Sequence, residues 1–171
     1  RAMLELLYAT GIRVSELIEL DVDDLNLYAY KLDLLLGYAK KQPENPRGTI
    51  GLPLCLNMYE LLPFWHTLFT RLGFAVKTSP VSSRALYQEG QATIPSDTAC
   101  FPAKLAHGHV QWLIDQGLRT IFHPCVFYER QETPGAQNHY NCPIVVSYPE
   151  NLKNNVDAVT ESHCVFQVNV K

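Results

Sequence analysis

The stretch "GTIGLPLCLNMYELLPFWHTLFTRLGFAVKTS", residues 48–79, decides the fold. It opens with a short β-rich run, residues 48–54, and closes with another, residues 74–79. Residues 63–74 between them have a proline suited to a first turn and apolar side chains at helical spacing on one face: Pro63, Phe64, Trp65, Leu68, Phe69 and Leu72. Strand, helix and strand in this order predict a βαβ unit in a parallel sheet.

The same alternation continues downstream. Residues 82–90 predict a helix that opens on serine, residues 102–117 a helix that ends at Gly117, and residues 119–125 a strand. We expect another strand over residues 142–148, "CPIVVSY", and a last helix over residues 149–159 with Pro149 at its start. The predicted fold class is α/β: a Rossmann-like three-layer domain with a mainly parallel sheet, preceded by a short all-α N-terminal segment.

The chain before residue 48 has a different character. Residues 1–27 show helical spacing of apolar residues, a break at Gly11, and a second short helix that ends near the acidic turn 21–24. Residues 28–47 read as an amphipathic helical linker that ends in two prolines and a glycine. We therefore expect a helical segment at 1–27, a linker at 28–47 and an α/β domain at 48–171 whose C-terminal end is truncated or divergent.

Composition excludes several classes of function. With 171 residues, 47% hydrophobic and 18% charged, the chain can bury a core. A net charge of -3 gives no support for nucleic-acid binding. No apolar run approaches the roughly 20 residues of a membrane span, and the N-terminus lacks the sections of a signal peptide. We expect a cytoplasmic protein without a membrane partner.

Three of the five cysteines lie beside prolines at predicted element ends. Cys100 precedes a predicted helix, Cys125 ends a predicted strand, and Cys142 precedes the strand predicted at 142–148. An odd, widely spaced set in a reducing compartment disfavours disulfides and leaves metal binding or plain burial. Thiolates from separate loops suit zinc or an iron-sulfur cluster, although no compact CxxC pair is present and a strictly parallel sheet would place Cys142 at the opposite edge.

Other polar residues are candidates for binding. Asn57 and Glu60 follow the first predicted strand, at the edge of a parallel sheet where ligands bind, and Asn57 is the candidate binding residue. His107 and His109 lie two apart on a helix, so they face different sides, and we expect packed or half-exposed histidines. His139 lies in a turn-rich loop, as a ligand, a proton donor or a turn residue. The glycines form neither GxGxxG nor a phosphate loop, so ATP hydrolysis is not expected.

Four blocks carry a family resemblance: residues 48–76, 94–110, 121–129 and 138–158. They closely resemble the activase-related domain of the 2-hydroxyacyl-CoA dehydratase activator family. The resemblance implies iron-sulfur electron transfer in anaerobic acyl-CoA metabolism, with dehydratase or activator subunits as partners. It also implies a 4Fe-4S cluster with Cys100, Cys125 and Cys142 as ligands. The sequence departs from the family pattern at Leu54 and in the tail from residue 160, so Cys164 has no family support.

The opening residues, "RAMLELLYATGIRVSELIELDVDDLNL", resemble the start of the catalytic domain of tyrosine recombinases. The resemblance implies that Arg13 contacts a scissile phosphate and that Glu16 is the neighbouring acidic residue. No histidine starts an HxxR and no tyrosine follows in a nucleophile context, so this would be a catalytically incomplete DNA-integration fragment, joined near residues 27–30. The remaining alternative is a metal-free interaction module with buried cysteines.

Overall fold

A four-stranded parallel sheet forms the centre of the protein. The computed structural model describes residues 22–37, 41–131, 133–161 and 165–167. The strands are β1 (Thr49–Leu52), β2 (Ala75–Thr78), β3 (Thr120–Phe122) and β4 (Val165–Gln167), in the spatial order β2-β1-β3-β4. All pairings are parallel. The predicted α/β class is confirmed.

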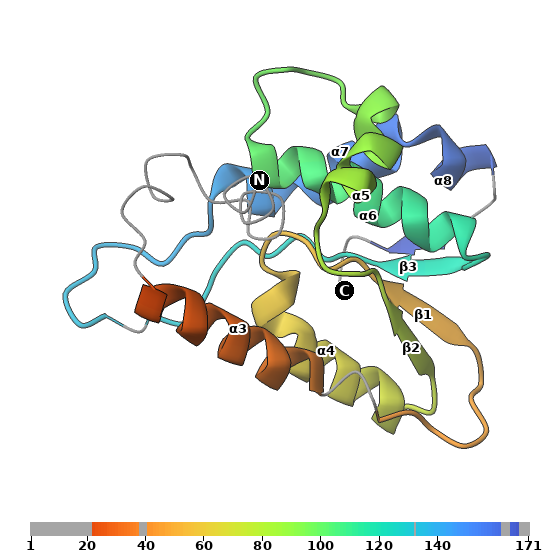
Figure 1. Cartoon of the computed structure of the whole chain (residues 1–171), viewed down its shortest axis with the longest axis horizontal. Helices are drawn as coiled ribbons and strands as arrows, with labels where there is room; N and C mark the ends of the chain where they lie inside the picture. The colour runs from red at the N-terminus through yellow and green to blue at the C-terminus, as the bar shows by residue number, and fades with distance from the viewer. Residues whose placement is uncertain (1–21, 38–40, 132, 162–164, 168–171) are drawn as a thin grey trace.

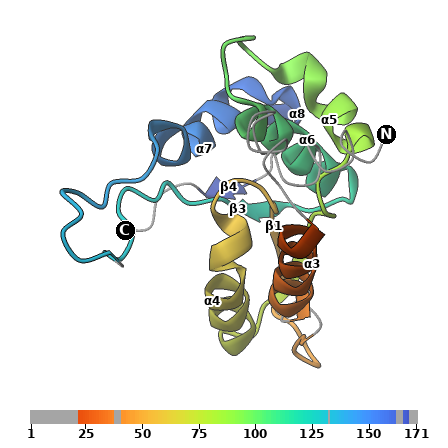
Figure 2. The same ribbon diagram turned by 60° about the vertical axis from the view of Figure 1, so that its left-hand side comes forward.

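Helices cover both faces of this sheet (Figure 1). They are α3 (Val22–Gly37), α4 (Met58–Arg71), α5 (Arg84–Gly90), the 3-10 helix η2 (Gln91–Thr93), α6 (Phe101–Asp115), α7 (Pro143–Asn155) and α8 (Asp157–Glu161). Figures 1 and 2 show α3 and α4 on one face and the helices α5 to α8 on the other. The result is three layers with one hydrophobic core on each side of the sheet.

The β1-α4-β2 unit forms as predicted, but α4 begins at Met58, well before Pro63, which lies inside the helix. The apolar face predicted for this helix is divided. Trp65 and Phe69 pack edge-on against Phe122 of β3, with ring centroids 4.6 and 5.1 Å apart. Phe64, Leu68 and Leu72 are exposed. Met58, Leu62 and His66 form the buried face of α4. The neighbouring side chains Phe64, Leu68 and Leu72 therefore face solvent.

Residues 142–148 are not a strand. They begin α7, in which Pro143 occupies the first turn and Pro149 lies inside the helix. Ile144, Tyr148 and Leu152, each four residues apart, face the core beneath α6. The β-branched run and Pro149 favoured the wrong prediction, whereas this four-residue spacing decides the structure. The last strand is β4, which lies in the tail expected to be divergent.

The α5-α6 crossing depends on two glycines. A Cβ atom on Gly108 would collide with the backbone oxygen of Leu86, and one on Gly90 would collide with the backbone nitrogen of Gly108. Both glycines therefore serve close approach of two helix backbones. Ser83 caps α5 by accepting a hydrogen bond from the amide of Leu86 at 3.2 Å, as predicted.

One glutamine side chain blocks an edge of the sheet. Val76 lies on the edge strand β2 and turns its amide and carbonyl away from β1. Gln42 Nε2 donates to the Val76 carbonyl and Gln42 Oε1 accepts from the Val76 amide, each at 2.8 Å. The Arg47 amide also donates to the Gly73 carbonyl at 2.8 Å. Segment 41–47 is thus bound to the sheet and blunts an edge that could otherwise pair with another chain.

We predict that Gly108→Ala lowers the free energy of unfolding by about 3 kcal/mol, because the new methyl group must push α5 away from α6. Gly37→Ala is the matched control, since nothing lies within 4 Å of a Cβ atom there. Urea unfolding of both variants measures the difference. Equal stability of the two variants would show that the crossing does not require glycine.

Candidate functional site

The strand order places a crevice between the ends of β1 and β3. The chain leaves the central strand β1 for β2 on one side, then crosses back to β3 on the other. In open parallel sheets, ligands bind beyond the carboxyl ends of the strands at such a reversal. The segments that follow these two strands, residues 53–57 and 123–142, therefore hold the candidate site.

The turn after β1 is strained and presents Asn57. Leu56 has φ 52, in the left-handed region that a leucine rarely adopts. Asn57 is the N-cap residue of α4, yet its side chain makes no capping hydrogen bond. Its Nδ2 atom is buried and has no hydrogen-bond partner within the described structure. An unsatisfied donor at this position is costly, so a ligand with an acceptor atom would relieve it.

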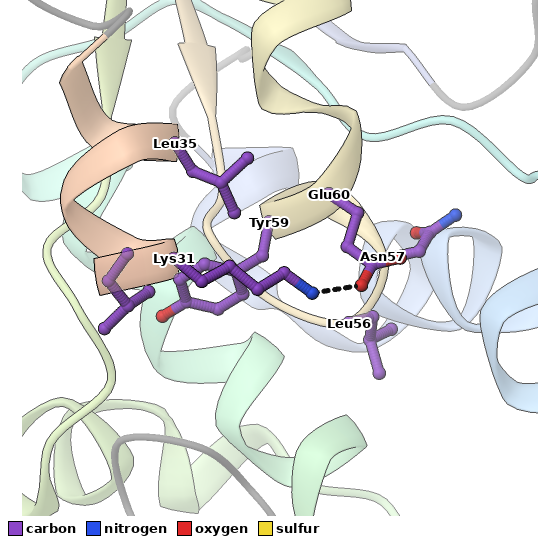
Figure 3. A pocket seen from close by; sticks show the side chains of 7 residues that line it. Lys31, Leu35, Leu56, Asn57, Tyr59 and Glu60 are labelled. Atoms are coloured by element: carbon purple, nitrogen blue, oxygen red, sulfur yellow. Dashed lines mark hydrogen bonds and ion pairs between the residues drawn. The ribbon is translucent and has the colours of Figure 1, made fainter. Parts of the chain in front are cut away.

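Two pockets meet at Asn57 and Glu60. The first, of about 290 Å³, lies between α3 and α4, and its lining is Lys31, Leu32, Leu35, Leu56, Asn57, Tyr59 and Glu60. Figure 3 shows the Lys31 side chain reaching across this pocket to Glu60, with Nζ 2.6 Å from Oε1. The second, of about 440 Å³, lies between Asn57, Glu60 and the loop 129–141.

The loop that follows β3 is stabilised by hydrogen bonds between its own residues. Tyr128 and Tyr140 form an antiparallel bridge, and the Glu129 amide donates to the His139 carbonyl at 3.0 Å. Asn141 Nδ2 donates to Glu129 Oε1 at 2.9 Å. Phe127 is 52% exposed, Tyr128 56% and Tyr140 65%, and the loop projects from the body (Figure 2). The second pocket therefore has a wall that is ordered by local contacts.

A buried polar network fixes the other side of the site. His109 of α6 is fully buried, with Nδ1 2.7 Å from Ser79 Oγ and Nε2 2.9 Å from Ser82 Oγ. Ser79 Oγ also accepts from the Leu54 amide at 2.7 Å. Ser82 Oγ lies 3.4 Å from the Tyr59 hydroxyl. The network joins the ends of β1 and β2 to α6, and it anchors a tyrosine that lines the first pocket.

His123, at the end of β3, is fully buried and neither ring nitrogen has a hydrogen-bond partner within the described residues. Burial lowers its pKa to about 3. Burial, and then the proximity of His123, also lower the pKa of His109 to about 3. Both imidazoles are therefore neutral at physiological pH.

The three cysteines predicted as metal ligands share the carboxyl edge of the sheet. Because 142–148 begin a helix, Cys142 is the N-cap of α7 and lies on this edge, as does Cys100, the N-cap of α6. Both are exposed, and Cys125 is half-buried with its thiol pKa raised by burial. No group of three His, Cys, Asp or Glu side chains arranged to hold a metal ion occurs among the described residues. The predicted three-cysteine site is not assembled there.

The histidine predictions concern His107, His109 and His139. His107 and His109 face different sides of α6 and are both fully buried, as predicted for packed histidines. His107 contacts Thr93 Oγ1 at 2.8 Å and the Tyr148 hydroxyl at 3.0 Å. His139 lies exposed in the loop, with Nδ1 3.0 Å from the Glu129 carbonyl. Arg13, Glu16 and Cys164 lie outside the described residues.

Sequence reasoning missed the polar network that anchors the site. Ser79 ends a predicted strand and Ser82 begins the predicted helix that follows it, so their position at the ligand edge was available as a signal. The sequence analysis does not single out Tyr59, and for His109 it predicts only a packed or half-exposed histidine.

Comparison with known proteins identifies the family of the sheet-forming part. The profile of the "CoA enzyme activase uncharacterised domain" matches residues 49–171. The chain belongs to this family. The match extends over the tail from residue 160, where the sequence predicts a departure from the family pattern. The activase domain contains the whole sheet, both pocket walls that follow β1 and β3, and the three candidate cysteines.

The N-terminal part of the chain has other relatives. The phage integrase family profile matches residues 1–65, overlapping the activase domain over 49–65. Tyrosine recombinase XerC of Staphylococcus haemolyticus is 31% identical over 128 residues, which cover 71% of this chain and 42% of that protein. XerD of Staphylococcus epidermidis is 74% identical over 27 residues, 16% of this chain and 9% of that protein. The chain spans less than half the length of these relatives.

No solved structure matches the chain. Among the helices of the described ranges, none is both long and apolar enough to cross a membrane.

Buried neutral histidines predict a loss of stability in acid. The unfolded chain takes up protons on His109 and His123 below about pH 6.5, whereas the folded chain does not until about pH 3. The unfolded state then binds more protons, so stability falls as the pH falls below 6.5, by about 2 kcal/mol for each histidine at pH 5. Urea unfolding between pH 8 and pH 5 measures the slope.

The variant His123→Leu isolates one of these groups. Because neither ring nitrogen of His123 has a partner in the described part of the chain, the substitution removes one titrating group without leaving a broken hydrogen bond there. We expect the free energy of unfolding to depend less steeply on pH in this variant, because one proton fewer is taken up on unfolding. Phe64→Leu, at an exposed position without a titrating group, is the control and should keep the full slope. An unchanged slope in His123→Leu would contradict the assignment.

Proposed function

We propose that this chain is a component of CoA-enzyme activation, related to the ATP-dependent activator of 2-hydroxyacyl-CoA dehydratases, that docks on a dehydratase or activator subunit. The observation that carries the proposal is the match of the activase-domain profile over residues 49–171. The absence of a phosphate-loop motif in the sequence agrees with a role beside an ATP-driven subunit.

The projecting loop supports the docking part of the proposal. Phe127, Tyr128 and Tyr140 expose aromatic surface on a segment that its own hydrogen bonds hold in place. Exposed aromatic side chains are enriched at protein interfaces because they bury much area at low entropic cost. The loop therefore offers a rigid docking element beside the crevice.

We expect the double variant Phe127→Ser/Tyr140→Ser to bind its dehydratase or activator partner at least tenfold more weakly, because interface aromatics often contribute more than about 1 kcal/mol each. Phe64→Ser on α4 is the matched control, since Phe64 is 59% exposed but lies on a different element. Sedimentation of oxygen-free mixtures with each purified subunit measures binding. If the parent chain forms a complex with neither the dehydratase subunit nor the activator subunit, the proposed function is wrong.

The iron-sulfur part of the family role needs its own test. The described residues do not fit a cluster held by this chain alone, because Cys100, Cys125 and Cys142 do not form a metal-holding group. The iron-sulfur proposal predicts stoichiometric iron and acid-labile sulfide in protein purified without oxygen, and a fall in both in Cys100→Ser. Metal-free, folded protein would contradict it. Cys55→Ala is the control, since Cys55 is buried in the core.

A second candidate function rests on the integrase match over residues 1–65. On this proposal the N-terminal segment is a tyrosine recombinase fragment that binds DNA through Arg13 without cleaving it. Salt-sensitive DNA binding that Arg13→Ala removes would support it. DNA binding that is equal in Arg13→Ala and the parent chain, or absent from both, would exclude it.

A further inference from the structure

The two pockets that meet at Asn57 and Glu60 have opposite chemistry. On the α3 side the lining is mainly apolar: Leu32, Leu35, Leu56 and the ring of Tyr59. On the loop side it is almost wholly polar: Glu129, Arg130, Gln131, Thr133, Asn138, His139, Tyr140 and Asn141, with Ala136. The two pockets therefore form the apolar end and the polar end of one site, with Asn57 at the junction.

The apolar end is small and its shape is fixed. Its volume of about 290 Å³ is at the lower limit for a ligand pocket, which suits a short chain better than a large ring system. Figure 3 shows Leu35 and Leu56 beside the Lys31-Glu60 ion pair and the Tyr59 ring. Because the Tyr59 hydroxyl contacts Ser82, which His109 holds, this wall does not need to reorganise when a ligand binds.

The polar end favours a neutral ligand. Its described residues set the carboxylates of Glu60 and Glu129 against the guanidinium of Arg130, and this balance disfavours a polyphosphate. Glu60 is paired with Lys31 and Glu129 accepts from Asn141, so both are engaged. His139 Nδ1 lies by the Glu129 carbonyl oxygen, which can only accept, so Nδ1 carries a proton and donates it. Amides and hydroxyls match such a lining.

The junction holds a buried donor that is not satisfied among the described residues. In Figure 3 the Asn57 carboxamide points away from the Lys31-Glu60 ion pair and out of the apolar end. Its Nδ2 atom has no partner among the described residues. A carbonyl oxygen placed between an apolar chain and an amide-bearing arm would accept from this donor. The ligand class that fits has an apolar end, a carbonyl at the junction and a neutral amide end.

We propose that this cleft binds a short-chain acyl thioester of pantetheine, with the acyl chain between α3 and α4 and the amide-bearing arm beneath the loop 129–141. Asn57 donates to the thioester carbonyl. A nucleotide attached to the arm stays outside the cleft. The choice of a thioester rests on the proposed function, whereas the division into an apolar end, a donor and a neutral polar end does not.

Titration calorimetry of the full chain tests the proposal with butyryl-pantetheine, pantetheine and butyryl-CoA. We expect butyryl-pantetheine to bind at least tenfold more tightly than pantetheine, because the acyl chain buries apolar surface. Butyryl-CoA should bind no more tightly than butyryl-pantetheine. Equal binding of pantetheine and butyryl-pantetheine, no binding of either, or a tenfold gain from the nucleotide would overturn the proposal.

Matched substitutions on α3 locate the acyl chain. Leu35→Trp fills the apolar end and should abolish the preference for the acylated ligand. Leu34→Trp is the control, because Leu34 is 56% exposed on the same helix and does not line the pocket. Equal effects of the two would overturn the assignment. Urea unfolding midpoints confirm that both variants fold.

Asn57→Ala tests the junction independently of α3. We expect about tenfold weaker binding of butyryl-pantetheine, the loss of one hydrogen bond, and no change for pantetheine, which lacks the thioester carbonyl. Unchanged binding of butyryl-pantetheine would remove Asn57 from the site. These titrations need no partner subunit, so they can fail while subunit docking succeeds, and docking can fail while they succeed.

Discussion

The arrangement of the carboxyl edge depends on one buried imidazole. His109 has no solvent exposure and uses both ring nitrogens, one towards Ser79 after β2 and one towards Ser82 before α5. Ser79 in turn accepts from the Leu54 amide after β1, so a helix on one face of the sheet is tied to the ends of two strands. A buried polar group is tolerated only when its hydrogen bonds are made. The ends of β1 and β2 and helix α6 therefore have to keep their relative positions. Tyr59, whose hydroxyl contacts Ser82, is held in place by the same network.

That rigidity contrasts with the unsatisfied groups nearby. Asn57 Nδ2 and both ring nitrogens of His123 are buried without partners among the described residues, and Leu56 holds a left-handed backbone. Functional sites are where strained backbone and unsatisfied polar groups cluster. Here they cluster at one edge of the sheet. The edge is also where strand order reverses. Topology, strain and unsatisfied donors therefore point to the same crevice by separate physical arguments.

The periodic parts of the fold could be predicted from the sequence, and the long-range contacts could not. The β1-α4-β2 unit, the serine cap of α5 and the end of α6 near Gly117 follow from local pattern and turn chemistry. Residues 142–148 were predicted wrongly because a short apolar run with prolines fits a strand or a buried helix equally well. Asn57 was found from its place after a strand. The structure places Asn57 beside pocket walls from residues 31–35 and 129–141, and it places Gln42 over Val76. These are contacts between distant parts of the chain, and no local sequence pattern encodes them.

Both family profiles match residues 49–65, and the structure shows to which domain these residues belong. These residues form β1, the strained turn and the first half of α4. β1 pairs with residues 75–78 on one side and with Ile121 on the other, all of which lie beyond the integrase match. Both neighbours of β1 come from the activase domain, so residues 49–65 lie within the structure of that domain. The same contacts extend upstream: Gln42 binds Val76 and Lys31 pairs with Glu60, so the segment before β1 is held against the domain whose crevice it helps to form.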